Sequence, residues 1–288
     1  MGKDCLCLAR LCVMKKKKNK SGAIAAYILA NLEEAERLTI SSLAEKTETS
    51  YATVCRFLKD LGVSGIKEFK RLIGKEIERN KQIEVKIDNY SLEGEQGFES
   101  ISKRVCDFSS SVVASCADSM RESSIAAVIR AVKKAGSICF VGLGTSAVTA
   151  QYAYTKFFRL NLNCSFDTDV IISKMKASVM KRGDVLFVIS SSGRTKPVLE
   201  TAKTAKANGA TVISVCDFVH SPLFAVSDIY IHTTLRDSNK YLDMDFPLIQ
   251  GQITIIDVIY SCLCREMKNS AAFSVKKTTE AVSVYKSV

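Results

Sequence analysis

The stretches SICFVG at residues 137–142 and DVLFVIS at residues 184–190 decide the fold of the longer part of this chain. Two further runs, TVISVC at 211–216 and DIYIHT at 228–233, have the same character. Each run is short and rich in Val, Ile or Phe, and helical stretches separate one run from the next. This alternation is typical of a parallel, doubly wound sheet with helices on both faces, so residues 101–288 are predicted to form an α/β domain.

Weaker elements complete the predicted α/β domain. A strand near residues 163–166 fits between the first two runs, and helices near residues 105–113 and 125–132 precede the sheet. The last helix is expected at roughly residues 246–267. Its isoleucines recur along one face, so it could cover the sheet or pack against a second subunit.

Two loops of this sheet have the composition of an anion site. Residues 142–147 read GLGTSA after the first run, and residues 190–195 read SSSGRT after the second. Ligands of open parallel sheets bind beyond the carboxyl ends of the strands, where these loops lie. Small residues allow close backbone approach, hydroxyls donate hydrogen bonds, and the N-terminus of the following helix exposes unpaired N–H groups. The loops therefore predict a phosphate site, to which Arg194 could add charge.

A dinucleotide site is the alternative interpretation of the first loop. Gly142-x-Gly144-x-x-Ala147 fits the dinucleotide fingerprint, and Asp167 stands near the position of a ribose-binding acid. The serines and Gly-x-Thr of the second loop have no function in such a fold. Two hydroxyl-rich turns facing one crevice favour a compact phosphate ester, and a nicotinamide-dependent enzyme stays open as a rival.

A basic segment precedes the α/β domain. The chain has 41 Lys and Arg against 30 Asp and Glu, and residues 1–80 alone hold 16 basic and 10 acidic side chains. Four stretches of this segment show the three-and-four spacing of amphipathic helices. We therefore predict an all-α domain over residues 21–80, followed by a linker over residues 81–100, where no periodicity is sustained.

The second and third of these helices have the pattern of a helix-turn-helix. Thr39 is expected to cap the second helix, and Gly62 is expected to end the third, with a polar turn between the two helices. A recognition helix needs short polar residues at its start and cationic groups for the DNA backbone. A plain helical bundle and a protein-docking module are the alternatives. The side chains predicted to contact DNA are Ser50, Tyr51, Thr53, Arg56 and Lys59.

The composition argues against several other classes of protein. Eleven cysteines are scattered along the chain without the spacing of a disulfide scaffold, so we expect reduced thiols and predict no metal site. No stretch approaches the roughly 18 apolar residues of a membrane span, so a cytoplasmic protein without membrane contact is expected. Residues 1–20 are expected to be a poorly ordered tail, and we hypothesise that Met14, not Met1, is the natural start.

Two parts of the chain resemble a known family. Residues of about 130–235, with Gly142-x-Gly144-x-Ser146 and Ser190-x-Ser192-Gly193-x-Thr195, resemble a sugar isomerase (SIS) domain, which binds phosphosugars. Residues of about 20–77, including Thr53-Val54-x-Arg56-Phe57 and Ser64-Gly65-x-x-Glu68, resemble the N-terminal helix-turn-helix of RpiR-type transcriptional regulators. That family joins the same two modules in this order. The resemblance implies an effector site made by Gly144, Ser146, Ser190, Ser192, Gly193 and Thr195.

The sequence departs from the family pattern at two places. Family members often carry Asp-x-His after the second strand, whereas this chain has Asp167-Thr168-Asp169. Many members also have an acidic residue soon after the last strand, a position for which Asp237 could stand in. The identity of the effector could differ accordingly.

The predicted site lacks an evident catalytic set. Aldose–ketose isomerisation needs a Glu or His base near the carbon-bound proton. No glutamate lies between Glu200 and Glu266, and the two histidines, His220 and His232, are expected to be structural. We therefore predict a DNA-binding transcriptional regulator whose phosphosugar effector modulates operator binding, with a phosphosugar isomerase as the alternative. A homodimer on a palindromic double-stranded DNA operator is expected, and no cofactor is predicted.

Overall fold

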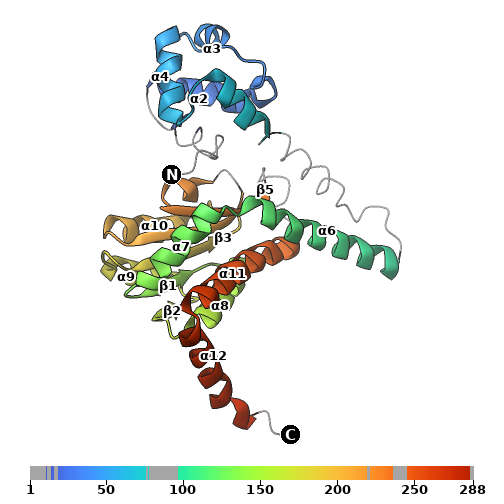
Figure 1. The fold of residues 1–288 in the computed structure, drawn as a ribbon, viewed down its shortest axis with the longest axis vertical. Coiled ribbons are helices and arrows are strands. Elements are labelled where there is room, and N and C mark those ends of the chain that lie inside the picture. Colours follow the sequence, from blue (N-terminus) through green and yellow to red (C-terminus); the bar gives the residue numbers. More distant parts are fainter. Residues whose placement is uncertain are drawn as a thin grey trace. The chain divides into compact units, whose positions relative to one another are not determined.

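The computed structural model divides the chain into two compact units, Met1–Asn89 and Tyr90–Val288 (Figure 1). Most of the expected linker, residues 81–96, lies outside the described residues, and helical structure resumes at Phe98. The structure describes residues 11, 14–15, 19–75, 77, 97–218, 221–235 and 245–285.

The described part of the N-terminal unit is helical. A side-chain carboxylate caps the start of the helix over residues 66–75. Glu68 Oε2 accepts hydrogen bonds from the backbone N–H and the hydroxyl of Ser64, both at 2.6 Å. This pair explains the Ser64-Gly65-x-x-Glu68 motif. The elements are α2 (Lys20–Ala30), the 3-10 turn η1 (Leu32–Glu34), α3 (Ile40–Lys46), α4 (Tyr51–Leu61) and a helix over residues 66–75.

The two central helices carry the expected caps. Thr39 and Ser42 form a capping box, in which each hydroxyl accepts a hydrogen bond from the backbone N–H of the other residue. Ser50 Oγ accepts a hydrogen bond from Thr53 N at 3.2 Å and so starts α4. Gly62 ends α4 with a φ of 85°, a left-handed conformation that favours glycine. The predicted helix-turn-helix is confirmed.

The helices enclose an apolar core that extends beyond the predicted domain boundary. Leu11 and Met14 are buried in this core, although the sequence predicts a tail over residues 1–20. Leu11 and Met14 are three residues apart, which is the spacing of one helix face. The other residues of the expected tail that precede Asn19, except Lys15, lie outside the described residues. Fully buried core residues include Ile24, Ile28, Leu43, Phe57, Phe69 and Ile73.

The described part of the C-terminal unit is built on a five-stranded parallel sheet with the order β2-β1-β3-β4-β5. The predicted α/β fold is confirmed, including the weak strand that comes second in the chain. The chain leaves β1 toward one edge of the sheet and returns on the other side at β3, which makes a topological switch point. The strands are β1 (Ile138–Val141), β2 (Cys164–Phe166), β3 (Val185–Ser190), β4 (Thr211–Phe218) and β5 (Ile229–Leu235).

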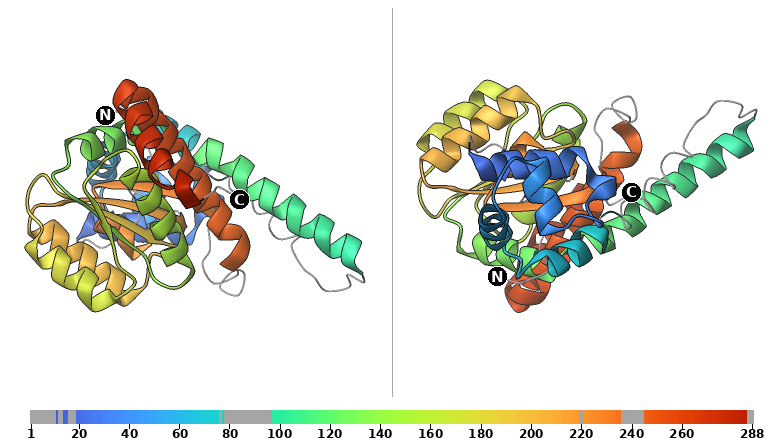
Figure 2. Two further views of the ribbon diagram at one scale, coloured as in Figure 1. Left: turned by 90° about the horizontal axis from the view of Figure 1, so that it is seen from below. Right: turned by 90° about the horizontal axis from the view of Figure 1, so that it is seen from above.

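Helices cover both faces of the sheet, as Figure 2 shows. Residues of α7, α8 and α11 share a core with one face, and residues of α9 and α10 share a core with the other face. The short 3-10 turns η2 (Pro222–Ala225) and η3 (Ser283–Tyr285) are also present. The helices are α6 (Phe98–Ser119), α7 (Glu122–Lys134), α8 (Thr145–Phe158), α9 (Val170–Val179), α10 (Lys196–Ala207), α11 (Asp245–Met267) and α12 (Asn269–Ala281).

Alternate residues of the strands fill the two cores. Phe187 of β3 packs with Phe140 and Phe157 on the α8 side, with ring centroids 5.3–5.9 Å apart. Leu186 and Val188 point to the opposite core, beside α9 and α10. Since both faces are buried, every strand position can be apolar, which is why the strands read as continuous apolar runs.

The C-terminal end contains one helix more than the sequence analysis predicts. The expected last helix corresponds to α11, and α12 follows it after Lys268, whose φ is 46°. Ala271 alone among the residues of α12 is buried. Because α12 buries so little apolar surface, its sequence lacks the stripe that identifies an amphipathic helix.

Candidate functional site

The loops after β1 and β3 meet at the carboxyl edge of the sheet. β1 and β3 are parallel neighbours, so both loops leave the sheet at the same edge. Ser191 N donates a hydrogen bond to Ser146 Oγ at 3.1 Å, and the hydroxyls of the same two residues lie 3.3 Å apart. Loops that are 45 residues apart in the sequence therefore form one continuous hydroxyl-rich surface at the switch point.

Two glycines allow the loops to take this shape. Gly193 has a φ of 59°, and a Cβ at this position would overlap the side chain of Ser221. Gly142 has no room for a side chain either, since a Cβ there would lie 2.5 Å from the carbonyl oxygen of Ser146. Both predicted loops thus depend on glycine for close packing of the backbone.

Two hydroxyls of the second loop accept hydrogen bonds from backbone N–H groups of the same loop. Ser190 Oγ accepts a hydrogen bond from Gly193 N at 3.1 Å, and Ser192 Oγ accepts one from Arg194 N at 3.2 Å. A serine hydroxyl that accepts from the backbone keeps its own O–H proton for a further acceptor. Ser190 is buried and Ser192 is half-buried, so the two hydroxyls lie at different depths of the loop.

Two helices begin at these loops. Gly144 precedes α8, and Thr195 precedes α10. In the part of the chain that the structure describes, no side chain caps either N-terminus. The helix dipoles favour negative charge at both first turns, although Ala147 N of α8 already donates to the carbonyl oxygen of Gly144 at 3.0 Å. Arg194 is exposed beside them.

A buried polar cluster that sequence reasoning missed lies directly behind the second loop. Gln252 of α11 donates hydrogen bonds from Nε2 to Ser191 Oγ at 3.0 Å and to Asp217 Oδ2 at 2.8 Å. Thr233 Oγ1 donates to Asp217 Oδ1 at 3.1 Å. The available signals were Gln252 among the isoleucines of the helix expected at residues 246–267 and Asp217 directly after the apolar run 211–216.

The acids after β2 have partners near them. Asp167 forms an ion pair with Lys176 at 2.5 Å, and Asp169 caps α9 by accepting hydrogen bonds from two backbone N–H groups. His232 is buried within β5. His220 and Asp237, which the sequence also singled out, lie outside the described residues.

The predicted DNA-contacting residues lie at the start and on the outer face of α4. Tyr51 is 59% exposed, and Arg56 and Lys59 are exposed as well. Ser50 and Thr53 bind each other, with their hydroxyl oxygens 2.9 Å apart at the helix N-terminus. The structure thus brings an aromatic ring and two cations to a solvent-facing surface, whereas the two hydroxyls serve first as a cap.

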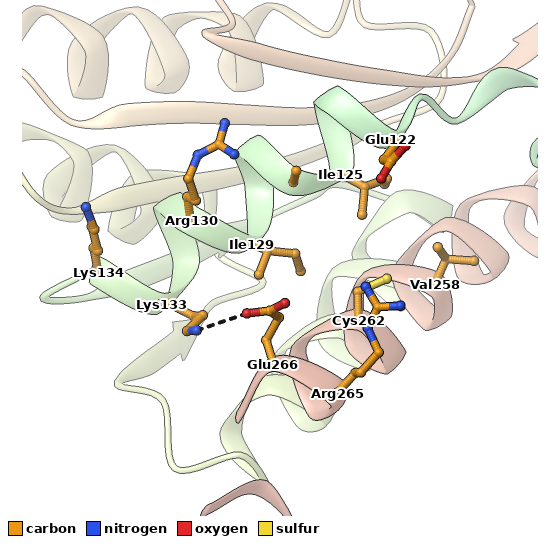
Figure 3. Close-up of a pocket in the computed structure, with 11 residues that line it drawn as sticks. Glu122, Ile125, Ile129, Arg130, Lys133, Lys134, Val258, Cys262, Arg265 and Glu266 are labelled. Atoms are coloured by element: carbon orange, nitrogen blue, oxygen red, sulfur yellow. Dashed lines mark hydrogen bonds and ion pairs between the residues drawn. The ribbon is translucent and has the colours of Figure 1, made fainter. Parts of the chain in front are cut away.

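A separate pocket of about 660 Å³ lies between α7 and α11 (Figure 3). Its floor is apolar, formed by residues such as Ile125, Ile129 and Val258, and the ion pair of Lys133 with Glu266 crosses it at 3.4 Å. None of its lining residues belongs to the two loops. The pocket is therefore distinct from the predicted effector site.

The described residues show neither a metal-binding cluster nor a membrane-spanning helix. Their His, Cys, Asp and Glu side chains include no group of three or more that could hold a metal ion. Among the helices that the structure describes, none has the length and apolar character needed to cross a membrane.

The two units together define a class of protein. Residues 6–80 match the helix-turn-helix domain of the rpiR family, and residues 131–242 match the SIS domain. A DNA-reading unit is thus joined to a parallel-sheet unit of the SIS type, which is the architecture of an HTH-type transcriptional regulator.

Relatives of known name support the same assignment. HexR of Pseudomonas aeruginosa, an HTH-type transcriptional regulator, is 32% identical over 255 residues, which cover 87% of this chain and 85% of HexR. HexR of Escherichia coli is 28% identical over 237 residues, covering 82% of this chain and 80% of its own length. The chain belongs to the RpiR family of transcriptional regulators, as the sequence predicts.

Solved structures with the same architecture include a ligand complex. The Vibrio vulnificus NanR protein complexed with ManNAc-6P is 26% identical, covers 96% of this chain and 97% of its own, and superposes with a TM-score of 0.58. The sugar isomerase domain of an RpiR transcription factor from Sphaerobacter thermophilus shares the fold, with 15% identity, a TM-score of 0.55 and coverage of 62% of this chain and 98% of its own.

Proposed function

We propose that this regulator binds a phosphosugar at the two loops and that the bound effector alters its affinity for operator DNA. The observation that carries the proposal is the hydrogen bond from Ser191 N to Ser146 Oγ, which joins the two hydroxyl-rich loops into one surface. The proposed effector-binding residues are Gly144, Ser146, Ser190, Ser192, Gly193 and Thr195.

The chemistry of these loops suits a phosphate group. Hydroxyls that already accept a backbone N–H can still donate to a phosphate oxygen, as Ser190 and Ser192 would do. The N-termini of α8 and α10, which begin at these loops, supply a dipole that favours negative charge. Because NanR was solved with ManNAc-6P, N-acetylhexosamine 6-phosphates and hexose 6-phosphates are the first candidates for this chain.

The DNA contact is proposed for the start and outer face of α4. Tyr51, Arg56 and Lys59 are exposed there and would reach base edges and phosphates, with Ser50 and Thr53 at the helix N-terminus. One recognition helix reads few base pairs, so a homodimer on a palindromic double-stranded operator is proposed, with the protein acting in the cytoplasm.

A regulatory role without catalysis is proposed for the SIS unit. A base for isomerisation would have to lie next to the sugar carbons. Glu200 is engaged on α10 with Lys203 at 2.7 Å, and His232 is buried in β5. The rival function, a phosphosugar isomerase, predicts turnover of a sugar phosphate by the purified protein, which spectrophotometric coupled assays would detect.

Thermal-shift screening tests the effector proposal. Purified full-length protein would be heated with each member of a panel of hexose 6-phosphates and N-acetylhexosamine 6-phosphates, beside the matching unphosphorylated sugars. We expect at least one phosphorylated compound to raise the melting temperature while its unphosphorylated form does not. A panel without any phosphate-dependent shift would contradict the proposal.

A further inference from the structure

A chain of buried polar contacts begins at the second effector loop. Ser191 turns its hydroxyl inward, where it lies 3.3 Å from Ser146 Oγ and accepts a hydrogen bond from Gln252 Nε2 at 3.0 Å. Gln252 is 1% exposed and belongs to α11. The central serine of the loop is therefore bonded to a helix that lies about 60 residues further along the chain.

The same amide holds a buried carboxylate. Gln252 Nε2 donates to Asp217 Oδ2 at 2.8 Å, and Thr233 Oγ1 donates to Asp217 Oδ1 at 3.1 Å. Asp217 is fully buried, and a carboxylate in such a place requires donors. Both N–H donors of the Gln252 amide are thus in use. Because the Gln252 amide has no further N–H group to offer, a displacement of the Ser191 hydroxyl must move the amide with it.

The orientation of this amide is fixed at a cost. The carboxylate of Asp217 can only accept hydrogen bonds, so the NH2 group of Gln252 must face it. Gln252 Oε1 is consequently buried without a hydrogen-bond donor among the described residues. A buried acceptor without a donor is unfavourable, so an apolar side chain would fill this part of the core at a lower cost than Gln252. We take this as a sign that the Gln252 amide has a role other than packing.

The far end of the chain of contacts reaches α6. Ser115 Oγ and Cys116 Sγ of α6 donate within their own helix to the carbonyl oxygen of Val112, at 2.7 and 3.3 Å. The same two atoms also lie 3.4 Å from the carbonyl oxygen of Thr233 and 3.5 Å from that of Gly251. A Cβ on Gly251 would lie 3.0 Å from side-chain atoms of Val112 and Thr233. α6, β5 and α11 are therefore packed too closely at this point for one to move alone.

α6 is the first described element of the C-terminal unit, so the chain enters this unit from the DNA-binding unit through it. Its N-terminal part extends away from the sheet of its own unit, as Figures 1 and 2 both show, and Phe98 at its start is 83% exposed. A displacement of α6 near residues 112–116 would therefore be carried along one continuous helix to its N-terminus, which follows the DNA-binding unit in the sequence.

We propose that Gln252 is a positioning residue that reports the state of the second effector loop to α6, an inference that rests on the proposed function of that loop. Phosphate held by Ser190, Ser192 and Thr195 displaces the intervening Ser191. The Gln252 amide follows the Ser191 hydroxyl, and the linked shift of Asp217, Thr233 and Gly251 moves α6.

Hydrogen exchange in the full-length protein tests this inference without ligand or DNA. Ser191→Ala removes the hydroxyl at the start of the chain of contacts, and exchange is measured at the amides of residues 112–119. We expect exchange of these α6 amides to become about 2- to 12-fold faster, the effect of one neutral hydrogen bond. In a Gln252→Leu background the same substitution should change their exchange by less than 2-fold.

A matched control separates this role from a general loss of packing. Gln250→Leu makes the same chemical change two residues away, at a half-buried side chain whose Oε1 has no partner among the described residues. In that background Ser191→Ala should still act on α6. A merely structural role for Gln252 predicts instead that exchange rises equally in β1, β3 and α6.

The inference is overturned if Ser191→Ala leaves α6 unchanged, or if its effect on α6 is the same with and without Gln252→Leu. Should Gln252→Leu not fold, Asp217→Asn takes its place, because it keeps the shape of the side chain and removes one acceptor. Since no effector is added, a negative result refutes the contact chain alone, whereas the phosphosugar panel tests the proposed function separately.

Discussion

Adding one methyl group to Gly193 tests whether the second loop is as tightly constrained as the structure indicates. Gly193→Ala places a side chain at a φ of 59°, which costs about 1–2 kcal/mol for an L-residue. The added Cβ would also overlap Ser221 and lie 3.0 Å from Cys216 Sγ. Ser221 cannot move away freely, because its hydroxyl lies 3.0 Å from the hydroxyl of Tyr230 in a hydrogen bond.

Gly144→Ala is the matched control for this substitution. Gly144 has a similar φ of 57°, but no described atom outside its chain neighbours lies within 4 Å of an added Cβ. Its ψ of −131° puts it in a backbone region that glycine occupies almost exclusively, so Gly144→Ala should cost about 1–3 kcal/mol through the backbone alone. At Gly193, overpacking adds about 1–3 kcal/mol to the backbone cost. The expected total for Gly193→Ala is about 2–5 kcal/mol.

Thermal unfolding of the two variants measures the difference. For a unit of about 200 residues, 1 kcal/mol corresponds to about 2–4 °C, so Gly144→Ala should lower the melting temperature by about 2–12 °C and Gly193→Ala by about 4–20 °C. Equal losses in the two variants would refute the view that Ser221 and Cys216 close the space behind this loop.

Three further predictions concern the DNA surface, the effector loop and the thiols. Arg56→Ala should weaken operator binding about 5- to 150-fold in a gel-shift titration without lowering the melting temperature, because its side chain is exposed; unchanged affinity would remove Arg56 from the DNA contacts. Ser192→Ala should weaken phosphosugar binding about 10- to 150-fold in calorimetry and abolish the response while leaving DNA binding intact, since it removes a hydrogen bond to a charged group; an unaltered response would count against this loop as the phosphate site. Burial raises the pKa of the Cys116 and Cys164 thiols to about 12, so at pH 8 about one in ten thousand is ionised, and iodoacetamide should modify the exposed Cys106 well before either; comparable rates by mass spectrometry would contradict their burial.

The sheet and the recognition helix could be predicted because local signals agree with the fold at those places. β3 is buried on both faces, so its residues form an uninterrupted apolar run that only a central strand needs. α4 is capped by Ser50 at its start and by Gly62 at its end, and both caps follow from the hydrogen-bonding needs of helix termini.

The inward turn of Ser191 could not be predicted in the same way. Three consecutive serines are chemically equivalent in the sequence, and the choice among them depends on Gln252, which reaches the loop from α11. α12 escaped prediction because Ala271 is its single buried residue. These features depend on contacts between distant parts of the chain, which periodicity and composition do not encode.

The most direct test of the central claim is an operator-binding titration with and without effector. Full-length protein would first select its operator from a pool of random duplexes, and fluorescence anisotropy would then give the Kd for that duplex with each phosphosugar. We expect at least one compound to change the Kd about 5- to 150-fold and Ser192→Ala to remove the change. A Kd that stays constant with every phosphosugar, in a protein that does bind its duplex, would contradict this expectation.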